Sequence, residues 1–84
     1  MKTVYYVQTF SYVKVGKKGK TRLQGDQPLQ MKTAQDAIGR AERFADKKVG
    51  VIAAAQEFDE VTGEYGNFTL LARYGTVPEM DDVF

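Results

Sequence analysis

Apolar and polar positions do not alternate cleanly over residues 3–15. This pattern predicts a long strand, and either both of its faces are largely covered or one of them is an aromatic surface. The segment is rich in β-branched and aromatic side chains and contains neither glycine nor proline. Residues 16–19, Gly-Lys-Lys-Gly, form a turn signal, so residues 20–23 are expected to return as a short second strand. Residues 24–28 then predict a loop.

An apolar stripe at helical spacing predicts one amphipathic helix that begins after Thr33 and ends at Gly50. The Thr33 hydroxyl can cap the first turn, and Asp36 can reach back toward the cap. Asp36 also stands four residues before Arg40, in the favourable order for an ion pair. The stripe consists mainly of alanine, which lets the helix lie close to the surface it covers: Ala34, Ala37, Ile38, Ala41, Phe44, Ala45 and Val49.

Two further apolar segments, residues 51–59 and 67–74, predict a second hairpin. If Thr62 and Gly63 form a two-residue turn, Val51 pairs with Tyr74 and the register of the hairpin follows. One face then carries Val51, Ala53, Ala55, Leu70 and Ala72. We expect this face to meet the alanine stripe of the helix, and the opposite face to carry Ile52 and Leu71.

These elements together predict an α+β fold of ββαββ order. An antiparallel sheet of three to four strands would carry one helix on one face. The chain of 84 residues is expected to form a single small domain over residues 1–78. Residues 79–84 are expected to form a flexible acidic tail, because Pro78 blocks further strand pairing.

Composition excludes several classes of chemistry. The chain contains no cysteine and no histidine, so disulfides, the usual zinc and copper ligands, and Cys or His nucleophilic triads are absent. Ser11 therefore has no imidazole to activate it, and no catalytic residue, cofactor site or metal site is predicted. No apolar run is long enough to span a membrane, and the N-terminus lacks a signal-peptide pattern, so a cytoplasmic protein is expected.

Charge is divided between the two halves of the chain. Residues 1–48 contain 11 Lys and Arg against 4 acids, a formal charge of +7, whereas residues 49–84 sum to −6. The fold could bring the two halves together so that the charges cancel. Alternatively, the division marks a basic surface for an acidic partner, or complementary faces for self-association.

The segment Gly16 to Thr21, GKKGKT, ends like a phosphate-binding P-loop but does not fit one. Lys14 stands where the first glycine of that motif is required, and no helix follows Thr21. We interpret the segment as a turn. A candidate basic patch surrounds it, next to the aromatic residues of strand 4–12: Lys14, Lys17, Lys18, Lys20 and Arg22. Such a combination suits single-stranded nucleic acid, which is the alternative function.

The leading hypothesis is a small non-enzymatic protein-interaction module. One helix cannot cover both faces of the sheet, so a homodimer is expected, formed through the open face or by edge pairing of the first strand. The candidate interaction surface is Tyr5, Phe10, Tyr12, Ile52 and Leu71.

Several segments together give the chain a resemblance to a family. They are residues 6–10 (YVQTF), 37–45 (AIGRAERFA), 50–53 (GVIA), Asp59 with 62–66 (TGEYG), and 73–78 (RYGTVP). In these segments the chain resembles a group of short bacterial proteins with no assigned function. Residues 5–10 also resemble the opening of peptidoglycan-binding sporulation-related repeats, although the closing helix and strand of those repeats are missing. The first resemblance implies a self-contained domain and brings no activity, ligand or site residue.

Overall fold

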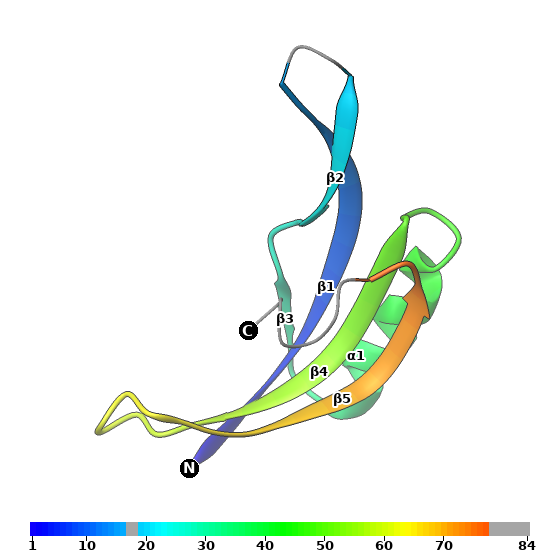
Figure 1. Cartoon of the computed structure of the whole chain (residues 1–84). Helices are drawn as coiled ribbons and strands as arrows, with labels where there is room; N and C mark the ends of the chain where they lie inside the picture. The colour runs from blue at the N-terminus through cyan, green and yellow to red at the C-terminus, as the bar shows by residue number, and fades with distance from the viewer. Residues whose placement is uncertain (17–18, 78–84) are drawn as a thin grey trace.

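A five-stranded antiparallel sheet carries a single helix on one face (Figure 1). The computed structural model describes residues 1–16 and 19–77. Its elements are β1 (Lys2–Val15), β2 (Lys20–Gly25), β3 (Leu29–Met31), α1 (Ala34–Phe44), β4 (Gly50–Phe58) and β5 (Tyr65–Gly75). The predicted α+β class and element order are confirmed, with five strands in place of three to four. The additional strand is β3, which lies just after the predicted loop. The predicted tail, residues 79–84, lies outside the described residues.

The long strand β1 lies inside the sheet, with pairing strands on both of its sides. β4 pairs with one side over Lys2 to Phe10, while β3 and then β2 follow the other side. An edge-to-edge dimer through the full length of β1 is therefore wrong, because β1 lies between β4 and the strands β3 and β2. From Ser11 to Val15, β2 is the one described strand that pairs with it. The sheet instead ends at β5 on one side and at β2 and β3 on the other.

Asp26 holds the chain against β1 where it passes from β2 to β3. Its backbone N–H donates to the Thr9 carbonyl at 2.8 Å. Its carboxylate accepts from the hydroxyls of Thr9, at 2.8 Å, and Ser11, at 2.9 Å, and its carbonyl accepts from the Gln8 amide at 3.0 Å. These bonds replace the strand pairing that is interrupted at this point.

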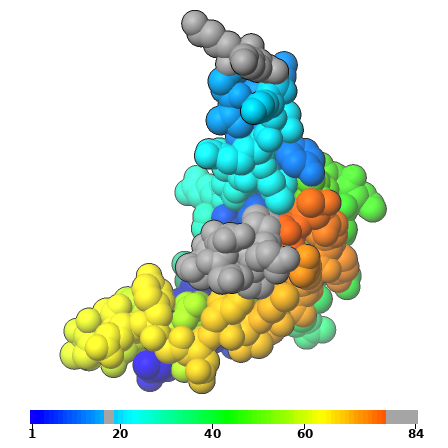
Figure 2. All heavy atoms as spheres, viewed as in Figure 1, coloured from blue at the N-terminus to red at the C-terminus, as the bar shows by residue number. Residues whose placement is uncertain are grey.

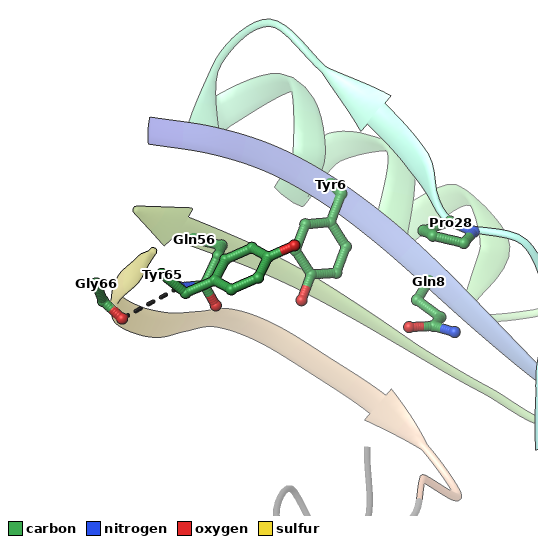
Figure 3. A pocket seen from close by; sticks show the side chains of 6 residues that line it. All are labelled: Tyr6, Gln8, Pro28, Gln56, Tyr65 and Gly66. Carbon is green, nitrogen blue, oxygen red and sulfur yellow. Dashed lines mark hydrogen bonds between the residues drawn. The ribbon is translucent and has the colours of Figure 1, made fainter. Parts of the chain in front are cut away.

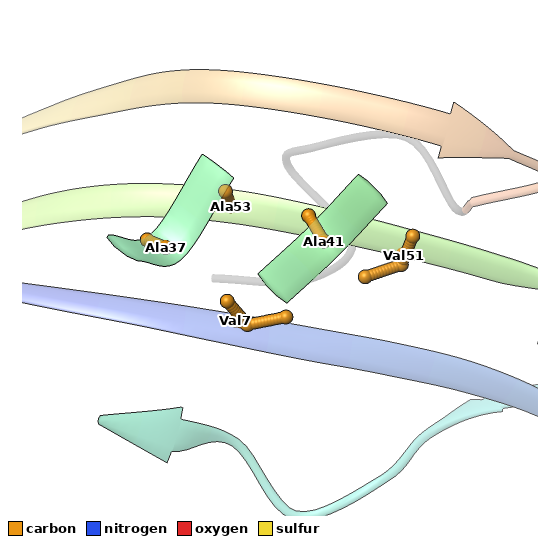
Figure 4. Packing of buried hydrophobic residues seen from close by; sticks show 5 residues of the cluster. All are labelled: Val7, Ala37, Ala41, Val51 and Ala53. Atoms are coloured by element: carbon orange, nitrogen blue, oxygen red, sulfur yellow. The ribbon is translucent and has the colours of Figure 1, made fainter. Parts of the chain in front are cut away.

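Helix α1 packs on the sheet through small side chains. Thr33 caps it as predicted, since its hydroxyl accepts from the Asp36 N–H at 3.0 Å. Ala37 and Ala41 are completely buried against Val7, Val51 and Ala53 (Figure 4). The expected end at Gly50 is wrong: the helix ends at Phe44, whose carbonyl accepts from the N–H groups of both Lys47 and Lys48. The chain then turns so that Gly50 can open β4.

The β4–β5 register is as predicted from Gly50 to Ala53 and then shifts. Val51 pairs with Tyr74 and Ala53 with Ala72, but Ala54 pairs with Leu70, so β5 carries an extra residue at Leu71. This bulge places Leu71 against the helix-side core. Leu70 pairs with Ala54 and is 39% exposed. Leu70 and Leu71 therefore lie on the opposite faces of the sheet from those predicted. A bulge shifts the register, and so the face, of the residues on its far side.

The turn between β4 and β5 is wider than the predicted two residues. Asp59 and Glu64 close it, with the Asp59 N–H donating to the Glu64 carbonyl at 2.8 Å. The Asp59 carboxylate accepts from the N–H groups of Val61 and Thr62. Gly63 has a φ of 78°, which favours glycine.

The two hairpin ends give the molecule an elongated shape, with extents of 46 × 28 × 17 Å. The β1–β2 arm projects from one end and the β4–β5 turn from the other (Figure 2). The first carries Lys14, Lys20 and Arg22, and the second carries the acids Asp59 and Glu60. Among the described residues one ion pair forms, between Lys2 Nζ and Glu60 Oε1 at 3.3 Å, and it does not involve the β1–β2 arm. The basic arm and the acidic turn therefore do not neutralise each other within the chain.

Candidate interaction surface

The five residues predicted as one interaction surface lie in three places. Phe10 and Ile52 are 2% and 0% exposed and pack with Val77 on the face opposite the helix. Tyr5 and Leu71 pack at the helix-side core. Tyr12 is 54% exposed on the β1–β2 arm. The expectation that these residues form one exposed surface is therefore wrong, because Val77 covers Phe10 and Ile52 and the bulge moves Leu71.

The remaining part of the face opposite the helix contains a hollow of about 550 Å³ (Figure 3). Its described lining comes from β1, β4, the start of β5 and the segment before β3: Tyr6, Gln8, Pro28, Gln56, Tyr65 and Gly66. Val4 and Phe58 line a second, adjoining hollow with Tyr6, Gln56 and Tyr65. None of these residues carries a charge. This part of the sheet therefore presents aromatic rings and neutral amides to whatever lies against it.

The side chains that line the hollow are held in place by their neighbours. The rings of Phe58 and Tyr65 contact each other in a tilted arrangement, with centroids 5.5 Å apart and planes at 49°, although Tyr65 is still 73% exposed. The Gln56 amide donates to the carbonyls of Glu57 at 3.0 Å and Gly66 at 3.2 Å. Burial raises the pKa of the Tyr6 phenol to about 12. The surface is thus ordered before anything binds to it.

The candidate basic patch is divided between the two faces of the β1–β2 arm. Val13 pairs with Arg22 and Val15 with Lys20, whereas Lys14 lies on the opposite face together with Tyr12. Lys17 and Lys18 lie outside the described residues. The structure therefore brings one lysine next to an exposed aromatic ring and places two other cations on the reverse side.

Groups suited to metal or acid–base chemistry are not gathered in the described part of the chain. No cluster of three potential metal ligands occurs in residues 1–16 and 19–77. The pKa of Asp59 is lowered by its hydrogen bonds from the Val61 and Thr62 N–H groups, so this carboxylate is occupied in holding the turn. Over the same residues, α1 is too short and too polar to cross a bilayer.

No family model, curated protein or solved structure matches this chain. Sequence reasoning missed Tyr6, Gln56 and Tyr65 as members of one surface. The pattern held no local signal for Tyr6, because apolar residues occupy both faces of its strand, whereas Gln56 is a polar residue at the end of an apolar run. Tyr65 could not have been placed, since it was assigned to the turn.

Proposed function

We propose that this chain is a small, non-enzymatic protein-interaction module that works as a homodimer. In the dimer, the hollow lined by Tyr6, Gln56 and Tyr65 on one copy faces the same hollow on a second copy. The observation that carries the proposal is the uncharged, aromatic character of this part of the sheet. An exposed apolar patch held in a fixed conformation is typical of an interaction site.

The absence of charge in the described lining favours a second copy of this chain as the partner that lies against the hollow. In a dimer with twofold symmetry each patch contacts its own copy, so any charge on the patch would lie near the same charge on the partner. The described lining of the hollow has no such charge. If the basic arm or the acidic turn contacted the same segment of the second copy, like charges would lie opposite each other and repel. The hollow is therefore the surface best suited to self-association.

Sedimentation equilibrium of the full chain up to about 100 μM tests the proposal, since weak dimers have Kd values in the micromolar range. Tyr65→Lys should raise the dimer Kd at least about tenfold, because it places like charges opposite each other in the interface. Val61→Lys is the matched control, since Val61 is 94% exposed at the β4–β5 turn and outside the hollow. A wild-type monomer at the highest concentration, or equal effects of the two variants, would contradict the proposal.

A second candidate function is binding of single-stranded nucleic acid by the β1–β2 arm. Tyr12 and Lys14 share one face of this arm, and Tyr12 is half exposed, so a base could stack on the ring while a phosphate meets the lysine. Fluorescence anisotropy with an oligothymidine at about 50 and 200 mM salt tests this, because phosphate contacts weaken steeply with salt. The variant Lys14→Glu should abolish binding, because it reverses the charge that shares a face with Tyr12. Equal affinity of this variant and the wild type would exclude the arm as the site.

A further inference from the structure

A second groove lies on the other side of the sheet, between the edge strand β3 and helix α1. Its volume is about 430 Å³, and it runs between Gln30, Met31 and Lys32 on one side and Gly39, Arg40 and Arg43 on the other. The helix lies over β1 and β4, while β3 lies beyond β1 (Figure 4). This groove is separate from the hollow used in the proposed dimer, since the two share no described lining residue.

β3 offers an edge for another strand. It pairs with β1 along one side only, through Tyr5 to Met31 and Val7 to Leu29. In the part of the chain that the structure describes, no strand pairs with its other side. Gln30 and Leu29 are exposed. An extended peptide can therefore add to this edge through backbone hydrogen bonds, as peptides do at other exposed sheet edges.

The groove carries an excess of positive charge. Lys32, Arg40 and Arg43 line it, against the single acid Asp36. None of the three cations is in an ion pair with a described acid, and the predicted pair between Asp36 and Arg40 does not form. Arg40 and Arg43 stand on one flank of α1, so their guanidinium groups can reach a chain lying alongside β3. Guanidinium groups bind carboxylates strongly because they can donate two parallel hydrogen bonds.

Gly39 leaves the middle of the groove open. It lies inside α1, where glycine costs helix stability, and a Cβ added there would meet nothing within 4 Å. The absence of a side chain at this position gives an incoming strand room to approach the helix.

We infer that the groove between β3 and α1 binds an extended acidic peptide segment of a partner protein. The segment adds as a strand beside β3 and places its carboxylates against Arg40 and Arg43. This inference is independent of the proposed dimer, because it concerns a different surface.

A fluorescein-labelled hexapeptide of alternating glutamate and valine tests the inference, with the glutamine counterpart as the charge control. The full chain should bind the glutamate peptide at least about tenfold more tightly than the glutamine peptide, and the double variant Arg40→Gln, Arg43→Gln should lose this preference. Arg22→Gln removes a cation from the β1–β2 arm and should leave the affinity unchanged. Equal binding of both peptides, or an equal loss in Arg22→Gln, would overturn the inference.

Gly39→Leu provides a second test in which misfolding cannot explain a loss of binding. Leucine favours the helix more than glycine does, so the variant should unfold at the same or a higher temperature. Its side chain would occupy the groove, and the glutamate peptide should bind at least about tenfold more weakly. Backbone amide shifts of Gln30 and Met31 on titration of the wild type with the peptide would locate the site. Full affinity in Gly39→Leu, or shifts confined to the β1–β2 arm, would contradict it.

Discussion

Gly50 and Gly75 face each other as register partners at the end of the β4–β5 ladder, and the chain passes closely over Gly50 just after leaving β5. Gly75 has a φ of 71°, which turns the chain, and the Thr76 N–H then donates to the Val49 carbonyl at 2.9 Å. This path places Val77 on Phe10 and Ile52. The pair of glycines thus allows the chain to cover a part of the sheet that the helix cannot reach.

Gly50→Ala should destabilise the protein by about 1 to 3 kcal/mol, because the new methyl group would collide with the Thr76 carbonyl and with Val77. Chemical denaturation monitored by circular dichroism measures the change. Gly39→Ala is the matched control: its methyl group meets open space in a helix, so stability should rise by up to about 1 kcal/mol. An unchanged free energy of unfolding in Gly50→Ala would show that the chain can move away from Gly50 without cost, and would contradict the prediction.

Asp26→Ala should cost about 1.5 to 3 kcal/mol of unfolding free energy, since the hydroxyls of Thr9 and Ser11 lose a charged acceptor. Asp26→Asn keeps one acceptor oxygen and should cost less. Urea denaturation of the two variants, together with Thr9→Val and the double variant, measures how strongly Asp26 and Thr9 are coupled. Additive effects of Asp26→Ala and Thr9→Val would mean that the observed bond contributes nothing to stability.

The Tyr6 phenol should remain protonated to higher pH than an ordinary tyrosine, because burial raises its pKa to about 12. A folded pKa above the unfolded value of 10.0 gives stability that is complete below pH 10 and is lost as the pH rises toward 12. Ultraviolet titration of tyrosinate should show a late component that Tyr6→Phe removes. Unchanged titration above pH 11 in that variant would contradict the assignment.

Acidification should loosen the β4–β5 turn. The pKa of the Asp59 carboxyl is lowered by the Val61 and Thr62 N–H donors. The stabilisation is therefore present above the ordinary value of 3.8 and is lost as the pH falls below it through the folded pKa. The carboxyl carbon shift of Asp59, followed by NMR, should titrate below that of a free aspartate. Asp59→Asn should remove the pH dependence of the Val61 amide shift.

Local signals in the sequence were sufficient for most of the fold. The Thr33 cap, the alanine stripe and the first two β4–β5 apolar pairs, Val51 with Tyr74 and Ala53 with Ala72, depend on neighbouring residues or on short turns, so the pattern alone predicts them. The bulge at Leu71 could not be predicted in this way, because inserting one residue into a strand leaves no distinct local pattern. The same applies to β3, whose three residues pair with a strand more than 20 positions away in the sequence.

The candidate site was harder to predict than the fold. From the sequence, Phe10 and Ile52 are apolar residues on a sheet face that the helix does not cover. Their burial depends on the path of the chain after Gly75, which places Val77 against them. The groove beside Arg40 and Arg43 depends on where β3 ends relative to α1. The cover by Val77 and the groove each depend on contacts between segments that are distant in the sequence. The periodicity of apolar residues does not predict such contacts.

The bulge at Leu71 also has a consequence for how the protein behaves at high concentration. β5 is an eleven-residue edge strand with Arg73 as its single charge. A regular edge strand of this kind can pair with the edge strands of further molecules and so start aggregation. The extra residue kinks the strand and breaks the regular ladder that a growing fibril would extend. Deleting Leu71 should straighten β5, and thioflavin T fluorescence should then report fibrils under conditions in which the natural chain stays dissolved.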